Sequence, residues 1–181
     1  MTRPLKFNRC AFCHRDEHRG QFAHRSDGGR CESCHTVQGF LPARFTSADH
    51  AKTRFALTGA HLATPCVACH KLQKVSRGGA FRIFRFQTTS CRSCHEDIHR
   101  GQFTKVKPVK NCNQCHLTSA WQQLVFDHDR DSRFALVGAH RKVACRDCHK
   151  QVRFKKLVFV LYRPIDPACQ TCHGSRRLTL E

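Results

Sequence analysis

The chain has 181 residues, with 14 Cys, 14 His, and 32 Lys or Arg against 13 Asp or Glu, so its formal net charge is +19. Apolar residues make up 40% of the chain, below the usual share of about 45–50%, so a conventional side-chain core is poorly supplied. The longest apolar run, 157–162, spans six residues, which excludes a membrane-spanning helix of about 20 apolar residues.

Every cysteine belongs to a Cys-x-x-Cys-His motif, and the motif occurs seven times. Two thiols three positions apart on one turn can add to vinyl groups on the same edge of a porphyrin, and the next residue then points its imidazole at the iron. Zinc knuckles, redox dithiols and disulfide scaffolds do not need a histidine after each pair. The sequence therefore predicts seven covalently attached haem c groups. The predicted attachment residues are Cys10, Cys13, Cys31, Cys34, Cys66, Cys69, Cys91, Cys94, Cys112, Cys115, Cys145, Cys148, Cys169 and Cys172, and the predicted proximal iron ligands are His14, His35, His70, His95, His116, His149 and His173.

Seven histidines lie outside the motifs, which equals the number of sixth ligands that seven haems need. Met1 is the only methionine, so ligation by Met, which raises the potential of cytochromes c, is essentially excluded. We therefore expect low-spin, low-potential haems with two histidine ligands each. The predicted distal ligands are His18, His24, His50, His61, His99, His128 and His140.

The chain is an internal duplication. Residues 10–22 match 91–103 at an offset of 81, and 54–61 match 133–140 at an offset of 79. A unit of about 80 residues thus carries three motifs. We expect a first trihaem unit over 1–90, a second over 91–168, and the single haem site of a truncated third unit over 169–181.

The spacing within a repeat restricts which haem each distal histidine serves. His18 lies four residues after His14, on the same helical face, so it should reach a neighbouring haem rather than the far side of its own. The same argument applies to His99.

The repeat also suggests a scheme for the remaining ligands. If the histidine of Gly-Ala-His serves the first haem of the next unit, His61 ligates the iron of the fourth motif and His140 that of the seventh. The first motif then has no upstream donor. His24 would fill that gap, and Lys105 occupies the equivalent position in the second unit.

Three haem motifs per unit, with distal histidines between them, resemble the trihaem and tetrahaem class III cytochromes c and their tandem-repeat relatives in anaerobic and metal-respiring bacteria. The resemblance covers about residues 10–173. It implies a location outside the cytoplasm, periplasmic or extracellular. No apolar stretch follows residues 1–6, so we expect either that a signal peptide was removed ahead of residue 1 or that the chain matures without one.

The expected fold class is a multihaem cytochrome c, in which haem faces replace the side-chain core. Short α-helices should carry the motifs, joined by long loops, with little β-structure. Two apolar, β-prone segments, 81–86 and 152–162, are candidate strands, the second chiefly over 157–162. They would either pair with each other or offer an edge to another chain. The 14 Phe residues would pack on porphyrins or form an ordinary core, and the composition fits both.

These features favour an electron carrier rather than an enzyme. Iron that already has both axial ligands favours outer-sphere electron transfer over substrate binding. The chain would act as a shuttle, a subunit of a larger assembly or a protomer of a haem wire. Haem propionates would offset much of the positive charge, and the remainder could steer an acidic redox partner, a membrane-associated donor or another cytochrome. The spread of charge does not favour nucleic acid. The alternative is a multihaem reductase of a small oxyanion or metal ion, which needs one open iron.

Overall fold

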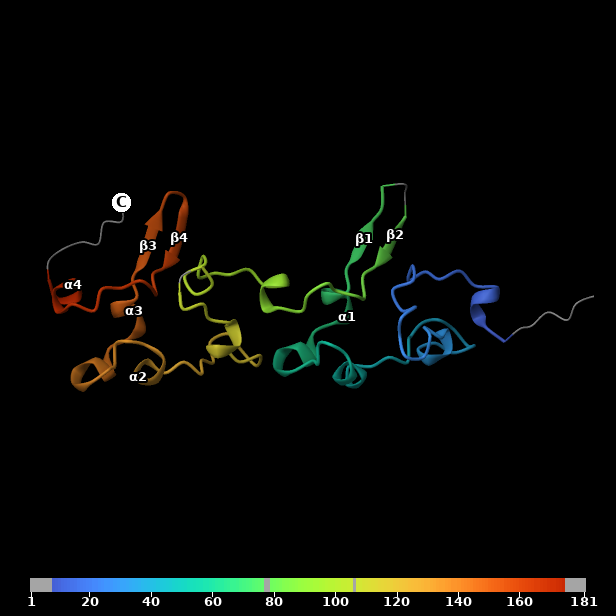
Figure 1. Cartoon of the computed structure of the whole chain (residues 1–181), viewed down its shortest axis with the longest axis horizontal. Helices are drawn as coiled ribbons and strands as arrows, with labels where there is room; N and C mark the ends of the chain where they lie inside the picture. The colour runs from blue at the N-terminus through green and yellow to red at the C-terminus, as the bar shows by residue number, and fades with distance from the viewer. Residues whose placement is uncertain (1–7, 77–78, 106, 175–181) are drawn as a thin grey trace, which may run out of the picture. The chain divides into compact units, whose positions relative to one another are not determined.

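The computed structural model describes residues 8–76, 79–105 and 107–174 (Figure 1). The chain divides into two compact units, Met1–Thr89 and Ser90–Glu181. Both consist mostly of loops, with short helices and one small antiparallel sheet in each. The described residues contain no helix that is long and apolar enough to cross a membrane.

The two units have a similar order of elements, but the second has an α-helix where the first has its third 3₁₀ helix, and it ends with one more α-helix. The first contains the 3₁₀ helices η1 (Cys10–Phe12), η2 (Cys31–Ser33), η3 (Ala48–Lys52) and η4 (Gly59–Ala63), then α1 (Cys66–Cys69), β1 (Leu72–Lys74) and β2 (Ala80–Arg82). The second contains η5 (Cys91–Ser93), η6 (Cys112–Gln114), α2 (His128–Asp131), η7 (Gly138–Lys142), α3 (Cys145–Cys148), β3 (Gln151–Phe154), β4 (Leu157–Val160) and α4 (Cys169–His173).

Each Cys-x-x-Cys-His motif forms one short helical turn. In the first six motifs, the backbone N–H of the histidine donates to the carbonyl of the first cysteine at 2.8–2.9 Å. The seventh motif is the helix α4 itself. This turn brings both thiols and the imidazole together over five residues. Short helices thus carry the motifs as expected, but at four of the seven they are 3₁₀ helices rather than the expected α-helices.

Each unit has one two-stranded hairpin, which Figure 1 shows extending from the short helix before it. Strand β1 pairs with β2, with Leu72 opposite Arg82, and β3 pairs with β4, with Phe154 opposite Leu157. The expected strands near 81–86 and 157–162 therefore exist as Ala80–Arg82 and Leu157–Val160.

The suggested pairing of these two segments with each other is wrong. Each pairs instead with a strand that begins two residues after the preceding motif histidine. The segment 152–162 is also a hairpin rather than one strand, because Lys155 adopts a left-handed conformation with φ 53° and the chain reverses there. A local pairing closes a much shorter loop than one between the two units would.

The described residues form no hydrophobic core. No apolar side chain among them is buried, and the one buried polar residue is Gln102, which is 7% exposed. The chain exposes 16005 Å², whereas a folded monomer of 20.8 kDa exposes about 9,000 Å². Side-chain burial therefore does not hold this polypeptide together.

Candidate haem-binding histidine pairs

Five motif histidines lie opposite a histidine from outside the motifs. In four of these pairs the ring centroids are 5.8–6.0 Å apart and the ring planes differ by 23–28°. In the fifth pair the centroids are 6.0 Å apart and the planes differ by 63°. The pairs are His18 with His35, His50 with His70, His99 with His116, His128 with His149, and His140 with His173.

The spacing of these rings fits an iron with two imidazole ligands. An imidazole nitrogen binds a transition metal at about 2.0–2.1 Å, and the ring centre lies about 1 Å further back, so two rings on one metal have centroids about 6 Å apart. No group of three or more His, Cys, Asp or Glu able to hold a bare metal ion occurs in the described ranges. A haem needs only two axial ligands from the protein, so the pairs suit haem better than a bare ion.

Hydrogen bonds to one ring nitrogen orient several of the motif histidines. In four of them Nδ1 lies within hydrogen-bond distance of a backbone carbonyl, and donation from Nδ1–H leaves Nε2 free for a metal, which is the usual arrangement for a metal-bound histidine. The acceptors are the carbonyls of Phe40 for His35 (2.7 Å), Ile83 for His70 (2.9 Å), Trp121 for His116 (2.8 Å) and Leu161 for His149 (3.2 Å).

Burial favours the neutral form of several paired histidines. It lowers the pKa of His70, His99 and His149 below the ordinary value. For His70 and His149 the hydrogen bond to a backbone carbonyl acts in the opposite direction but does not outweigh burial. A neutral imidazole is the form that binds metals.

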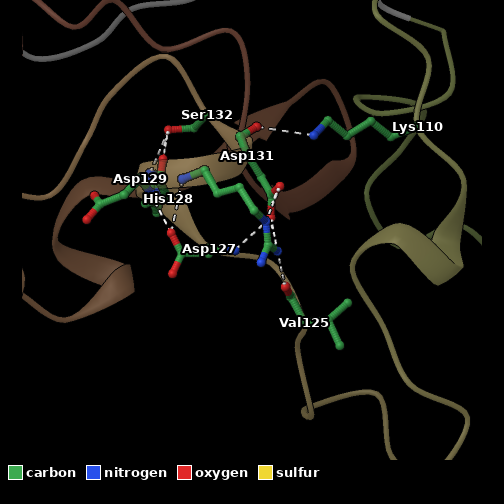
Figure 2. A network of polar contacts seen from close by, with 8 residues as sticks. Lys110, Val125, Asp127, His128, Asp129, Asp131 and Ser132 are labelled. Atoms are coloured by element: carbon green, nitrogen blue, oxygen red, sulfur yellow. Dashed lines mark hydrogen bonds and ion pairs between the residues drawn. The ribbon is translucent and has the colours of Figure 1, made fainter.

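Helix α2 presents His128 towards His149. Figure 2 shows the network: the Asp127 carboxylate caps the helix by accepting from the backbone N–H groups of Asp129 and Arg130 at 2.8 and 3.1 Å. The Ser132 hydroxyl donates to the His128 carbonyl at 2.8 Å and lies 3.1 Å from His128 Nδ1. The cap and this hydroxyl together set the direction of the imidazole.

An aspartate two residues before His18 shapes the turn that presents this histidine. The Asp16 carboxylate accepts from the backbone N–H groups of His18 and Gly20 at 2.8 and 2.6 Å. Partial burial raises the pKa of Asp16, but these two hydrogen bonds and the His18 imidazole together outweigh it, so the net pKa lies below the ordinary value. Asp97 makes the same pair of bonds in the second unit, to His99 and Gly101 at 3.0 Å each.

A glutamine joins each of these turns to the hairpin of its unit. Gln21 Nε2 donates to the carbonyls of His18 and Arg82, both at 2.9 Å, and its Oε1 accepts from the backbone N–H of Phe84 at 2.7 Å. Gln102 occupies the equivalent place in the second unit. The repeated Arg-Gly-Gln-Phe after His18 and after His99 is a signal that could have found both glutamines, for which no role was predicted.

One aromatic ring lies between successive histidine sites. In the first unit, Phe40 lies 5.4 Å from His14 and 5.2 Å from His35. Phe84 lies 5.4 Å from His18 and 5.0 Å from His70. Three consecutive motifs of the unit are thus connected through two phenylalanine rings.

The second unit uses the only tryptophan and the only tyrosine of the chain at the same places. Trp121 lies 5.1 Å from both His95 and His116. Tyr162 lies 5.2 Å from His99 and 5.0 Å from His149. Equivalent positions of the two units thus both carry an aromatic ring, but the residue type differs.

The first two motifs of each unit also approach each other through their thiols. Burial raises the pKa of Cys31, and the neighbouring Cys10 raises it further. Burial likewise raises the pKa of Cys112, with Cys91 as its neighbour.

Further ring contacts involve His61 and His95. His61 lies 5.4 Å from Phe55, and His95 contacts Trp121 as described above. His24 is exposed, and no ring contact joins it to His14 or to any other described histidine. Its role as a distal ligand stays a prediction, and the structure does not bring it beside the first motif.

Comparison with known proteins adds no assignment: no family model, no curated protein and no solved structure matches the chain.

Proposed function

We propose that the chain is an electron-transfer protein that carries seven covalently attached c-type haems. The observation that supports this most directly is the set of five histidine pairs with centroids 5.8–6.0 Å apart. Each pair combines one motif histidine with one histidine from elsewhere in the chain. When bound, a haem with two histidine ligands supplies low-potential, one-electron chemistry without binding a substrate.

The chain's own residues hold and orient these groups. The motif thiols fix each porphyrin edge to one helical turn, and the backbone carbonyls that accept from Nδ1 hold the imidazoles in one tautomer. The aspartate turns and glutamine links position the distal histidines without any hydrophobic core. With about 26 residues for each haem motif, haem faces would take the place of buried side chains.

The order of the sites within a unit supports a conduit. Phe40 and Phe84 each contact histidines of two successive sites, as do Trp121 and Tyr162. Haems held at such neighbouring sites would exchange electrons along the unit. We further propose that the conduit works outside the cytoplasm, between redox partner proteins, and that its positive charge steers acidic partners.

The test is to express the chain in a host that attaches haem c and to measure the molecular mass of the purified protein by mass spectrometry. Seven haems per chain are expected, and low-temperature electron paramagnetic resonance of the oxidised form should show low-spin signals for at least the five paired irons. A double variant of one motif, Cys66→Ala with Cys69→Ala, serves as the control and should lose one haem. A mature protein with intact thiols and no added mass would contradict the proposal.

A further inference from the structure

The proposed haem sites of the second and fifth motifs are equivalent positions of the two repeats. His18 faces His35 in the first repeat and His99 faces His116 in the second, both at 5.9 Å, with ring planes that differ by 25° and 28°. Backbone carbonyls lie 2.7 Å from Nδ1 of His35 and 2.8 Å from Nδ1 of His116. The two sites therefore match closely on the side of the motif histidine.

The opposite histidines of these two sites differ at the ring nitrogen Nδ1. His18 Nδ1 lies 3.3 Å from Oδ1 of Asp16, whose carboxylate also accepts from the backbone N–H of His18. His99 Nδ1 is buried and has no hydrogen-bond partner among the described residues. Within the described part of the chain, the same ring atom thus has a carboxylate acceptor in the first repeat but not in the second.

A substitution between the repeats accompanies this difference. Thr104 Oγ1 donates to Oδ2 of Asp97 at 3.4 Å. The equivalent residue of the first repeat is Ala23, which has no hydroxyl to donate. The Asp97 carboxylate is therefore bound by a side chain of its own turn, whereas the Asp16 carboxylate lies against the imidazole of His18.

An acceptor at Nδ1 changes how strongly an imidazole donates to a metal through its other nitrogen. When Nδ1–H donates to a carboxylate, the ring becomes more basic and stabilises ferric iron more than ferrous iron, which lowers the reduction potential. Burial acts in the opposite direction, because an environment with less water disfavours the additional positive charge of the ferric form. The side chain of His18 is 31% exposed, whereas Nδ1 of His99 is buried. Both differences lower the potential of the second site relative to the fifth.

We propose that Asp16 is a positioning residue that acts through His18 to set the reduction potential of the second haem below that of the fifth. This inference rests on the proposed function, because it needs haem at both motifs. When the two haems share one electron, the second iron is then oxidised and the fifth iron is reduced. A duplication with equivalent motifs thereby has a preferred direction for electrons.

The experiment is a spectroelectrochemical redox titration of the chain that carries seven haems. Two double variants assign the steps of the titration: Cys31→Ala with Cys34→Ala removes the second haem, and Cys112→Ala with Cys115→Ala removes the fifth. We expect the step that is lost with the second motif to lie at a lower potential than the step that is lost with the fifth.

Asp16→Asn tests the contact itself, and Asp97→Asn is its matched control. Both variants remove one negative charge at equivalent positions of the repeat, so a pure charge effect should be similar in the two. We expect Asp16→Asn to shift one step of the titration to a higher potential, and by more than Asp97→Asn does, because it also removes the acceptor at His18 Nδ1.

Two results would overturn the inference while leaving the haem assignment intact. One is a fifth-haem step at or below the potential of the second, and the other is an equal shift for Asp16→Asn and Asp97→Asn. If Asp16→Asn carried fewer than seven haems, the order of the two steps in the chain with Asp16 intact would still decide. A chain without haem would overturn the proposed function itself, and its molecular mass distinguishes that case.

Discussion

Gln102 donates from Nε2 to the backbone carbonyl of Val160 at 3.0 Å, across 58 residues of chain. Its Oε1 accepts from the backbone N–H of Tyr162 at 2.7 Å. Gln102 is also the one buried polar residue among those described. A single side chain thus fixes the turn of His99 to the hairpin that ends beside the sixth motif.

Replacing this glutamine should loosen the second unit. Gln102→Leu removes the side-chain partner of two backbone carbonyls and two backbone N–H groups, at a cost of about 1–3 kcal/mol for each group that is left without any partner and that water cannot reach. We expect a lower melting temperature for the loaded protein, and a similar but smaller effect for Gln21→Leu, whose site is less buried. Gln122→Leu, at an exposed position, is the control. Equal melting temperatures for Gln102→Leu and Gln122→Leu would show that the link contributes nothing.

Removing one of the proposed distal histidines should leave one haem iron with a free coordination position. His99→Ala takes away the imidazole opposite His116, so the ferric protein should gain one high-spin signal and the ferrous protein one additional CO. Ile98→Ala changes the adjacent side chain, which is 72% exposed, and should leave both readouts as they are. An unchanged spectrum for His99→Ala would remove His99 from the set of ligands.

Trp121 should be an internal reporter of haem occupancy. It is the only tryptophan, and it lies 5.1 Å from two motif histidines. Energy transfer to the adjacent porphyrins should quench its emission almost completely in the loaded chain, and the haem-free chain should fluoresce. A mixture of loaded Trp121→Phe protein with free tryptophan corrects for light absorbed by the haems. Bright emission from the loaded wild-type chain would place the haems away from this residue.

Low pH should destabilise the segment around α2, because it protonates the Asp131 carboxylate. Hydrogen bonds from the Arg130 guanidinium and from the backbone N–H of Asp127 lower the pKa of Asp131 from 3.8 to about 2. Because the folded-state pKa is depressed, this contribution is fully present above about pH 4 and disappears as the pH falls through about 2. Asp131→Asn should therefore lower the melting temperature at pH 7 but make little difference near pH 2.

The same measurement has a control in the first unit. Glu17→Gln removes an exposed carboxylate that makes no hydrogen bond or ion pair with the described residues, so its melting temperature should match wild type at both pH values. If the difference in melting temperature between wild type and Asp131→Asn did not depend on pH, the contribution of Asp131 would come from packing or neutral hydrogen bonds rather than from its charge.

The sequence could predict the local geometry of the motifs, because a fixed spacing of Cys, Cys and His needs only one turn of chain. It also indicated that His18 does not serve its own motif, since residues four apart share a helical face. It could not predict the first partner strand, because Leu72–Lys74 has one apolar residue in three and no alternation of apolar and polar residues. Most of Gln151–Phe154 lies inside the expected segment 152–162, but the reversal of the chain at Lys155 was not predicted.

Long-range polar contacts were also beyond the sequence. The bond from Gln21 to Arg82 spans 61 residues, and nothing in the residue types alone joins those two positions. The aromatic links show the same limit: Phe40 and Trp121 are equivalent only through the repeat, and an isolated phenylalanine fits a core as well as a haem edge.

The pairing of His140 with His173 has a consequence for how such a chain can grow. Under the proposed function, the two rings serve one iron and so join one repeat to the next, and this junction needs few other contacts between the repeats. Array length is then adjustable in whole repeats, much as in solenoid proteins whose stability is a sum of nearest-neighbour terms. A gene with residues 91–168 duplicated in frame should encode a longer array, with three additional haems and no redesigned interface.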